Sequence, residues 1–333
     1  MKRIGFLTFG HYQAVPGSLV RNASDALLQT VELAVAAEEL GADGAFTRVH
    51  HFARQLASPF PLLAAIAAKT SRIDLGTAVI DMRYENPLYL AEEAAATDLI
   101  ADGRLQLGLS RGSPESALNG YEAFGYAPAE SRSDADDARA KTELFRAAIG
   151  GAPIVAQASG RGLLAIEPQS PGLGERIWWG SGTRATAQWT GEQGMNLMSS
   201  TLLTEDTGVP FDELQAEQIT LYREAFAAAG HTHRPLVSVS RSIIPLTTDR
   251  DREYFGRERE SIDQVGYLDG GLARFGKSYV GEPDVVAAAL AKDAAVELAD
   301  TVLVTVPNQL GVVYNSHLLE SIVRLVAPAA GWR

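Results

Sequence analysis

Cysteine is absent from the 333 residues of this chain. Its absence excludes a disulfide framework, a thiolate nucleophile and a cysteine-ligated zinc or iron–sulfur site. Long hydrophobic runs are missing as well, because no stretch of about 18 apolar residues marks a membrane span. The opening MKRIGFLTFG is interrupted too soon for a secretory signal. We therefore expect a cytoplasmic protein without a membrane partner.

Basic residues are fewer than acidic residues in this chain. The 41 acidic residues outnumber the 29 Lys and Arg residues, which gives a net charge of −12. Nucleic-acid binding needs a basic surface, so nucleic acid is not an expected partner. A hydrophobic content of 46% is enough for a large core. No inter-domain linker is visible, and α/β barrels often exceed about 150 residues in one unit. We predict a single domain over residues 1–333.

Short apolar segments alternate with segments rich in Ala, Leu and Glu. The predicted strands span residues 4–9, 44–49, 73–80, 105–110, 177–179, 196–199, 236–244 and 301–306. The predicted helices span residues 25–40, 61–69, 87–100, 131–148, 183–191, 211–229, 283–291 and 316–325. This alternation is typical of parallel βα units, and the count of eight favours a closed (β/α)8 TIM barrel. An open doubly wound sheet is the alternative.

Two segments break this alternation. Residues 150–175 are rich in Gly and Pro and predict a small extra hairpin. Residues 247–276 contain the charged run TDRDREYFGRERE and then the Gly-rich LDGGLARFG. An insertion this long after a barrel strand is uncommon unless it is functional. We therefore predict a lid over the active site after the seventh strand.

Two glycine-rich stretches match the sequence patterns of phosphate-binding loops. GLARFGKS, residues 271–278, fits the P-loop pattern, but it lacks the strand before it and the helix after it that ATP binding requires. GSGTRA, residues 180–185, lies between an apolar strand and the start of a helix, where unpaired N–H groups suit a phosphate. No acidic residue follows about twenty positions later, so a dinucleotide is not implied. A purely conformational Gly-rich turn is the alternative.

LGLSRG closes the fourth predicted strand. Alternation places the leucines that begin at Leu105 toward the helices, and it places Ser110 toward the barrel interior. The carboxyl ends of barrel strands form the active face, so Arg111 is expected at its rim. An arginine there suits bidentate binding of phosphate or carboxylate. A structural ion pair is the alternative role.

His50 and His51 are adjacent in VHHF. Neighbours in an extended segment point to opposite faces, and His50 shares its parity with Phe46 and Arg48. We therefore predict that His50 faces the barrel mouth, where an imidazole with a pKa of about 6.5 suits acid–base catalysis. A structural His50 bonded to a backbone carbonyl is the alternative. No second set of ligands accompanies the pair, so no metal site is predicted.

Together these segments resemble the bacterial luciferase-like flavin monooxygenase family. The likeness extends nearly end to end through VHHF, PFPLLAAIAAKTSRIDLGTAVI, NPLYLAEEAAATDLIADGRLQLGLSRG, YEAFGYAPAESR, WWGSGT and YVGEPDVVAAAL. The resemblance implies a (β/α)8 barrel with an insertion after strand seven. It also implies oxidation of a small organic substrate by reduced FMN and O2, a separate flavin reductase that supplies the reduced FMN, and a homodimer.

The resemblance assigns roles to matching residues. His50 corresponds to a catalytic histidine near the reacting edge of the flavin. Ala78–Val79 corresponds to a cis peptide beneath the flavin ring, and Arg111 and Arg132 correspond to arginines that bind its phosphate. The full implied cofactor-binding set is Ala78, Val79, Glu92, Ser110, Arg111, Arg132, Trp179, Gly180, Ser181, Gly182 and Thr183.

The chain also departs from the luciferases themselves. Val49 and Ser181 stand where those enzymes have acidic residues, which argues against bioluminescence and a long-chain aldehyde substrate. A deazaflavin-dependent oxidoreductase that transfers hydride on the same barrel is one alternative, and a non-catalytic flavin-binding protein is another. The adjacent histidines, in place of an Asp-His pair, favour FMN over deazaflavin. No motif encodes the identity of the substrate.

Overall fold

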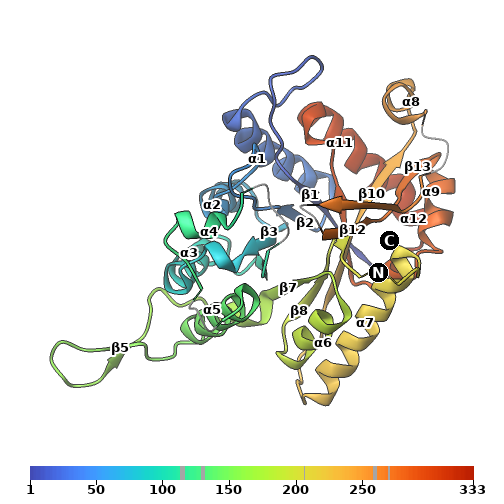
Figure 1. Cartoon of the computed structure of the whole chain (residues 1–333). Helices are drawn as coiled ribbons and strands as arrows, with labels where there is room; N and C mark the ends of the chain where they lie inside the picture. Colours follow the sequence, from blue (N-terminus) through green and yellow to red (C-terminus); the bar gives the residue numbers. More distant parts are fainter. Residues whose placement is uncertain (113–116, 129–131, 206, 258–260, 269–270) are drawn as a thin grey trace.

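Eight parallel strands form a closed barrel in the computed structural model (Figure 1), which describes residues 1–112, 117–128, 132–205, 207–257, 261–268 and 271–333. The strands are β1 (Arg3–Thr8), β2 (Gly44–Thr47), β3 (Asp74–Asp81), β4 (Leu105–Ser110), β7 (Ile177–Ser181), β8 (Asn196–Ser199), β10 (Val237–Pro245) and β14 (Thr301–Thr305). Each pairs with the next, and pairing of β8 with β10 and of β14 with β1 closes the ring. The predicted (β/α)8 barrel is confirmed.

Alternate residues of the strands fill two separate cores. Leu7, Phe46, Trp178, Met198 and Leu303 meet inside the barrel. The opposite parity packs against the surrounding helices, as the leucines of β4 were expected to do. This two-sided burial explains why the strands read as nearly continuous apolar runs.

A glycine makes room for the ring of Phe46 inside the barrel. A Cβ atom at Gly76 would lie 2.8 Å from the Phe46 ring and 2.1 Å from the carbonyl oxygen of Gln106. Any larger residue at this position would push neighbouring strands apart. The ring of Phe46 therefore fits within the barrel because β3 carries no side chain beside it.

The helices cover the outside of the barrel. The longer ones are α1 (Ala23–Leu40), α2 (Pro59–Lys69), α3 (Pro87–Ile100), α5 (Asp134–Ile149), α6 (Arg184–Glu192), α7 (Phe211–Ala228), α9 (Pro283–Leu290) and α11 (Gly311–Ser321). The shorter ones are α4 (Gly120–Ala123), α8 (Asp249–Phe255), α10 (Ala294–Leu298), α12 (Ala327–Ala329), 3₁₀ turns at Met82–Tyr84, Leu173–Arg176 and Asn308–Leu310, and a π turn at Ile322–Val326. None of the described helices is long and apolar enough to span a membrane.

Local side-chain bonds set several helix starts. Asn86 accepts hydrogen bonds from the N–H groups of Leu88 and Tyr89 and so begins α3, and Ser133 accepts from the N–H of Asp136 and begins α5. For α5, the start predicted from the sequence was residue 131, which lies outside the described residues. The last predicted helix, 316–325, begins five residues earlier than expected, because Asn315 bonds back to the carbonyl of Gly311 as an interior helical residue.

Two segments extend beyond the barrel. Residues 150–175 contain an antiparallel hairpin of β5 (Val155–Ala156) and β6 (Leu163–Leu164) that projects away from the barrel in Figure 1. After β10, the predicted insertion 247–276 contains α8, β11 (Gln264–Leu268) and β12 (Gly271–Phe275), and β13 (Ser278–Gly281) follows it. Strand β12 pairs with β11 and with β9 (Leu202–Leu203), so the insertion is joined to the loop after β8.

The fold excludes the P-loop interpretation of residues 271–278. This stretch forms β12 and the start of β13, with only Gly276 and Lys277 between the two strands. A P-loop requires a helix whose first N–H groups point at the phosphates. No helix begins in this stretch, so its match to the P-loop pattern is a coincidence.

Candidate functional site

A cavity of about 340 Å³ lies at the carboxyl ends of the barrel strands. Its volume is within the range of about 300–1,000 Å³ that is typical of small-molecule sites, and its place is the active face of such barrels. Of the residues expected at the cofactor, eight line it: Ala78, Val79, Ser110, Arg111, Trp179, Gly180, Gly182 and Thr183.

The floor of the cavity is apolar. Leu7, Val79, Met198 and Leu303 line it, and all four belong to or pack against the interior core. Beneath them the indole of Trp178 donates a hydrogen bond of 2.9 Å to Gln106 Oε1, which satisfies both polar groups. The cavity therefore has a dry lower surface without a buried charge.

The peptide bond between Ala78 and Val79 is cis, as the resemblance implies. The methyl groups of Val79 face Gly180 across the cavity wall: a Cβ at position 180 would lie 3.2 and 3.3 Å from them and 3.4 Å from the Cβ of Ser110. A Cβ at Gly182 would lie 3.0 Å from the carbonyl oxygen of Leu202. The two glycines thus keep the backbone after β7 close to the floor.

The predicted turn after β7 does open a helix. Thr183 begins α6, and its Oγ1 accepts a hydrogen bond from the N–H of Thr186. The carboxylate of Glu205 already accepts a hydrogen bond of 3.0 Å from the N–H of Arg184. Ser181 is buried and donates its hydroxyl to the carbonyl of Thr183, and it does not line the cavity. The start of α6 therefore offers part, not all, of the expected cradle.

Arg48 and Val49, rather than His50, line the cavity from the VHHF region, and Arg48 brings the charge. Its Nη2 lies 3.1 Å from Nε2 of His50, and its guanidinium lies 4.8 Å from the centre of the Phe9 ring. Burial, followed by the positive charge of Arg48, lowers the pKa of His50 to about 4. His50 is therefore neutral at pH 7. It contacts Arg48 but does not itself line the cavity.

His51 points into a different environment, as strand parity predicts. Its ring stacks on Tyr84 at 4.2 Å and meets Phe124 edge-on at 5.2 Å. Burial lowers the pKa of this imidazole too. His51 is part of the aromatic packing outside the cavity.

Besides Ser181, two expected cofactor residues lie outside the cavity lining. Arg132 is exposed before α5, and Glu92 lies half-buried on α3. Their roles stay predictions. The arginine that lines the cavity from this side is Arg139, further along the chain on α5. No sequence motif marked it.

Asp81 and a row of serines were also missed. Asp81 is buried at the end of β3 and forms an ion pair of 2.6 Å with Arg83, while burial raises the pKa of its carboxyl group. Gly112, at a φ of +97°, packs on it: a Cβ there would lie 2.0 Å from Asp81 Oδ2. A charged residue at a strand end was the available sequence signal for Asp81.

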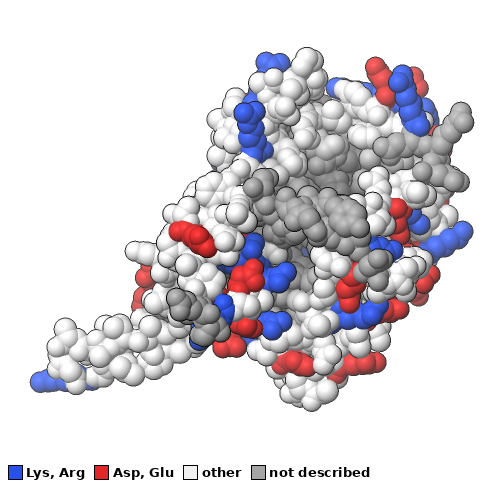
Figure 2. All heavy atoms as spheres, in the orientation of Figure 1, with Lys and Arg blue, Asp and Glu red and all other residues white. Residues whose placement is uncertain are grey.

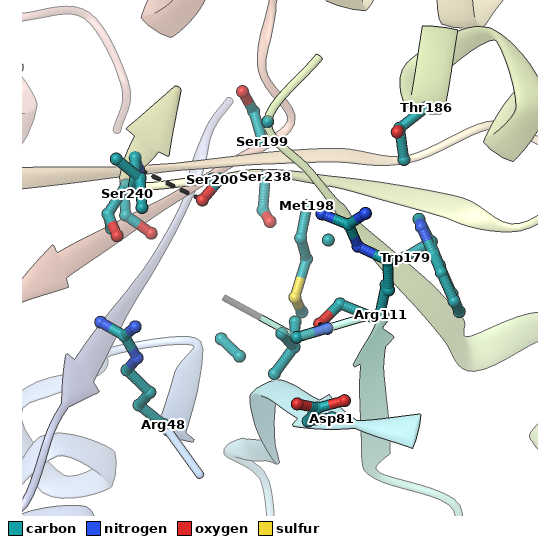
Figure 3. Close-up of a pocket in the computed structure, with 18 of the residues that line it drawn as sticks. Arg48, Asp81, Arg111, Trp179, Thr186, Met198, Ser199, Ser200, Ser238 and Ser240 are labelled. Atoms are coloured by element: carbon teal, nitrogen blue, oxygen red, sulfur yellow. Dashed lines mark hydrogen bonds between the residues drawn. The ribbon is translucent and has the colours of Figure 1, made fainter. Parts of the chain in front are cut away.

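The serines gather on one side of the cavity, opposite Arg111 and Trp179 (Figure 3). Ser199, Ser200, Ser238 and Ser240 come from β8, its following loop and β10. The hydroxyl of Ser199 is buried and has no hydrogen-bond partner among the described residues. This wall offers hydrogen bonds to a ligand. Within the described chain, no group of three or more His, Asp or Glu side chains could hold a metal ion.

The chain matches the model of the Luciferase-like monooxygenase family over residues 2–294. It is 37% identical over 86 residues to the oxygenase component of the flavin-dependent trigonelline monooxygenase of Acinetobacter baylyi. That match covers 25% of this chain and 24% of the relative. It is 35% identical over 103 residues to an F420-dependent glucose-6-phosphate dehydrogenase of Gordonia bronchialis, which covers 28% and 29%. These matches therefore span less than a third of each relative.

Solved structures match over almost the whole length. Monooxygenase RslO1 from Streptomyces bottropensis has a TM-score of 0.75 at 21% identity, with 98% of this chain and 99% of that chain covered. The oxygenating constituent of 3,6-diketocamphane monooxygenase from Pseudomonas putida has a TM-score of 0.70 at 18% identity, with the same coverage. At these identities the structural match supports the barrel fold. The family model, which spans most of the sequence, decides the assignment: this chain belongs to the luciferase-like monooxygenase family.

Proposed function

We propose that this chain is a flavin-dependent monooxygenase that uses reduced FMN and O2 to oxidise a small organic substrate. The observation that carries the proposal is the combination, in one cavity, of a flat apolar floor at Ala78–Val79 with Arg111 and Thr183 at one end. A planar ring with a phosphate arm needs these two kinds of surface. The related trigonelline enzyme is named as flavin-dependent, and the diketocamphane enzyme was solved with FMN.

The residues present fit FMN in size and charge. Gly180 and Gly182 let the backbone after β7 lie close to Val79 and Leu202, so backbone atoms form this wall of the cavity. In this proposal Arg111 would hold the phosphate, and a charged hydrogen bond of this kind contributes about 1.5–3 kcal/mol. The unpartnered Ser199 hydroxyl can pair with a polar edge of the ligand.

When bound, reduced FMN supplies the activation of O2. The chain supplies the surroundings. Its apolar floor excludes water, Arg48 presents a cation to the cavity, and His50 holds that arginine from behind. His50 is neutral and its Nε2 accepts the hydrogen bond from Arg48, so in this proposal it orients that arginine at the cavity.

The insertion after β10 fits the role of a lid in this proposal. Its strand β12 pairs Phe275 with Leu202, and Leu202 itself lines the cavity. The segment is thereby tied to the cavity wall. Our proposal further includes one domain, a homodimer in the cytoplasm, and a separate reductase that delivers reduced FMN.

A deazaflavin-dependent oxidoreductase is the second candidate. It is favoured by one finding, the similarity to F420-dependent glucose-6-phosphate dehydrogenase. That cofactor would occupy the same barrel mouth and transfer hydride without O2. The two candidates therefore differ in the cofactor that binds and in the need for oxygen.

Titration of the purified protein with FMN and with the deazaflavin coenzyme separates them. We expect FMN to bind the more tightly, and Arg111→Ala to weaken FMN binding by about 1.5–3 kcal/mol because a charged contact with the phosphate is lost. Arg161→Ala, on the exposed hairpin between β5 and β6, is the matched control and should bind FMN like the wild type. Equal FMN affinity in Arg111→Ala would refute the phosphate assignment, and preferential binding of deazaflavin would favour the second candidate.

A further inference from the structure

We propose that Arg139 is a second anion-binding arginine of the cavity, and that with Arg111 it selects a dianionic phosphate monoester over a phosphodiester. The inference rests on the proposed function, because the phosphate in question is that of FMN. It assigns the second cationic position to the body of α5 rather than to the exposed Arg132.

The position of Arg139 is set by α5. Ala135, one turn earlier on the same helix, also lines the cavity, so this face of α5 forms one of its walls. Thr183 and Thr186 at the start of α6 line the cavity too. Arg139 therefore borders the same end of the cavity as the proposed phosphate contacts.

Aromatic packing, not a carboxylate, holds this arginine. The guanidinium carbon of Arg139 lies 4.8 Å from the centre of the Trp189 ring. Trp189 in turn meets Trp179 edge-on at 5.0 Å, and Trp179 lines the cavity. Stacking on an indole face leaves the N–H donors at the edge of the guanidinium able to bind a ligand.

Neither Arg111 nor Arg139 forms an ion pair within the part of the chain that the structure describes. Arg111 is exposed and Arg139 is half-buried, whereas the buried Arg241 pairs with Asp293 at 2.6 Å and Arg83 pairs with Asp81. In a chain with a net charge of −12, two arginines without carboxylate partners at one cavity are unusual. On the face seen in Figure 2, Lys and Arg side chains are interspersed with acidic ones.

The charge balance at the start of α6 explains why two arginines are needed. The carboxylate of Glu205 occupies the N–H of Arg184 and brings a negative charge to the helix start. That charge opposes an incoming phosphate and offsets one arginine. Asp81, which also lines the cavity, is paired with Arg83, so Arg111 and Arg139 together with Arg48 leave the balance of the cavity positive.

A positive pair favours the more highly charged ligand. A phosphate monoester loses its second proton with a pKa of about 6, so it is mostly dianionic at pH 8 and mostly monoanionic at pH 5. A phosphodiester carries a single negative charge at both pH values. The two arginines should therefore bind FMN more tightly at pH 8 and should discriminate against the 5′-methyl phosphodiester of FMN.

The test compares Arg139→Gln, Arg139→Lys and the control Arg161→Gln. Binding of FMN, riboflavin and the FMN methyl ester is followed by flavin fluorescence at pH 5 and pH 8. We expect Arg139→Gln to lose about tenfold or more in FMN affinity at pH 8, with riboflavin affinity unchanged and with a smaller difference between the two pH values. Arg139→Lys should keep part of the affinity, and Arg161→Gln all of it.

Two results would overturn the proposal. One is equal FMN affinity in Arg139→Gln and the wild type. The other is an equal loss of FMN and riboflavin binding, which would mean that Arg139 acts only by packing on Trp189.

Failure of the proposed function has a different signature, namely no flavin binding by the wild type. In that case titration with inorganic phosphate, read by the fluorescence of Trp179 and Trp189, tests the anion site alone. A response of the wild type that Arg139→Gln lacks would support the anion site. The absence of a response in the wild type would refute it.

Discussion

The guanidinium of Arg48 lies between His50 and the cavity, with Nη2 of the arginine 3.1 Å from Nε2 of the histidine. An arginine only donates hydrogen bonds, so Nε2 of His50 accepts in this contact and carries no proton. The hydrogen bond requires a neutral imidazole, and the lowered pKa of His50 keeps the imidazole neutral, so the two observations agree. Burial disfavours the imidazolium, and the neighbouring cation disfavours it further.

Replacing Arg48 by Met should raise the pKa of His50 from about 4 toward its ordinary value. The reason is that a positive neighbour is removed while most of the burial remains, so the pKa should stay below about 6.5. Titration of the imidazole by NMR measures the change, with Arg54→Met as the control at a nearby loop. An unchanged midpoint in Arg48→Met would show that burial alone sets this pKa.

His50→Ala should slow turnover while FMN affinity stays nearly the same. The reason is that His50 accepts a hydrogen bond from Arg48, so its loss releases the arginine that lines the cavity. The FMN affinity is expected to hold because His50 does not line the cavity. Single-turnover kinetics with reduced FMN check the prediction. A rate equal to that of the wild type would end the catalytic assignment of His50.

Glu85 predicts a pH dependence of stability. Burial, followed by the charges of Glu93 and Asp81, raises the pKa of its carboxyl group to about 7. The unfolded chain, with an ordinary pKa near 4.5, releases this proton at a lower pH than the folded protein. The stabilising contribution is therefore complete below about pH 4.5 and is lost as the pH rises through 7.

Glu85→Gln removes this contribution. We expect the free energy of unfolding of the wild type to fall more between pH 5 and pH 8 than that of the variant, as measured by urea unfolding. Glu253→Gln, on the exposed face of α8, is the control and should follow the wild type. Parallel pH profiles for wild type and Glu85→Gln would contradict the raised pKa.

Gly108→Ala should destabilise the barrel by about 1–3 kcal/mol through overpacking. A Cβ at this position would lie 2.3 Å from the carbonyl oxygen of Thr77 and 2.7 Å from Met198 Sδ, and the backbone of β4 has no room to move away. Gly174→Ala is the matched control, because a Cβ there meets nothing within 4 Å. Urea unfolding that gives the same stability for both variants would contradict this account.

The order of the barrel strands could be predicted because each strand signal is local. Apolar runs such as the one at β4 need only their own residues to be recognised. The helices between them return the chain to the same end of the sheet, so neighbouring strands pair in parallel. Helix ends were less certain, as Asn315 shows: an Asn near a helix start is read as a cap, yet here it bonds within the helix. The pairing of β12 with β9 joins segments about seventy residues apart and left no trace in either.

The site divides in the same way. Residues on a strand or directly after it, such as Ser110 and Arg111, could be placed because strand parity and the barrel's active face fix them. Arg139 could not, since its position depends on how α5 packs beside Trp189, which no local pattern records. His50 shows the limit of parity: the rule selects it for the barrel mouth, but Arg48, and not His50, lines the cavity.

The most direct test of the central claim is oxygen uptake by the protein mixed with reduced FMN and a panel of small organic substrates. The account predicts that reduced FMN binds in the barrel cavity, that O2 is consumed with oxygenated product from at least one substrate, and that Arg111→Ala lowers the apparent affinity for reduced FMN. Oxygen-independent turnover with the deazaflavin coenzyme, together with no binding of FMN, would contradict it.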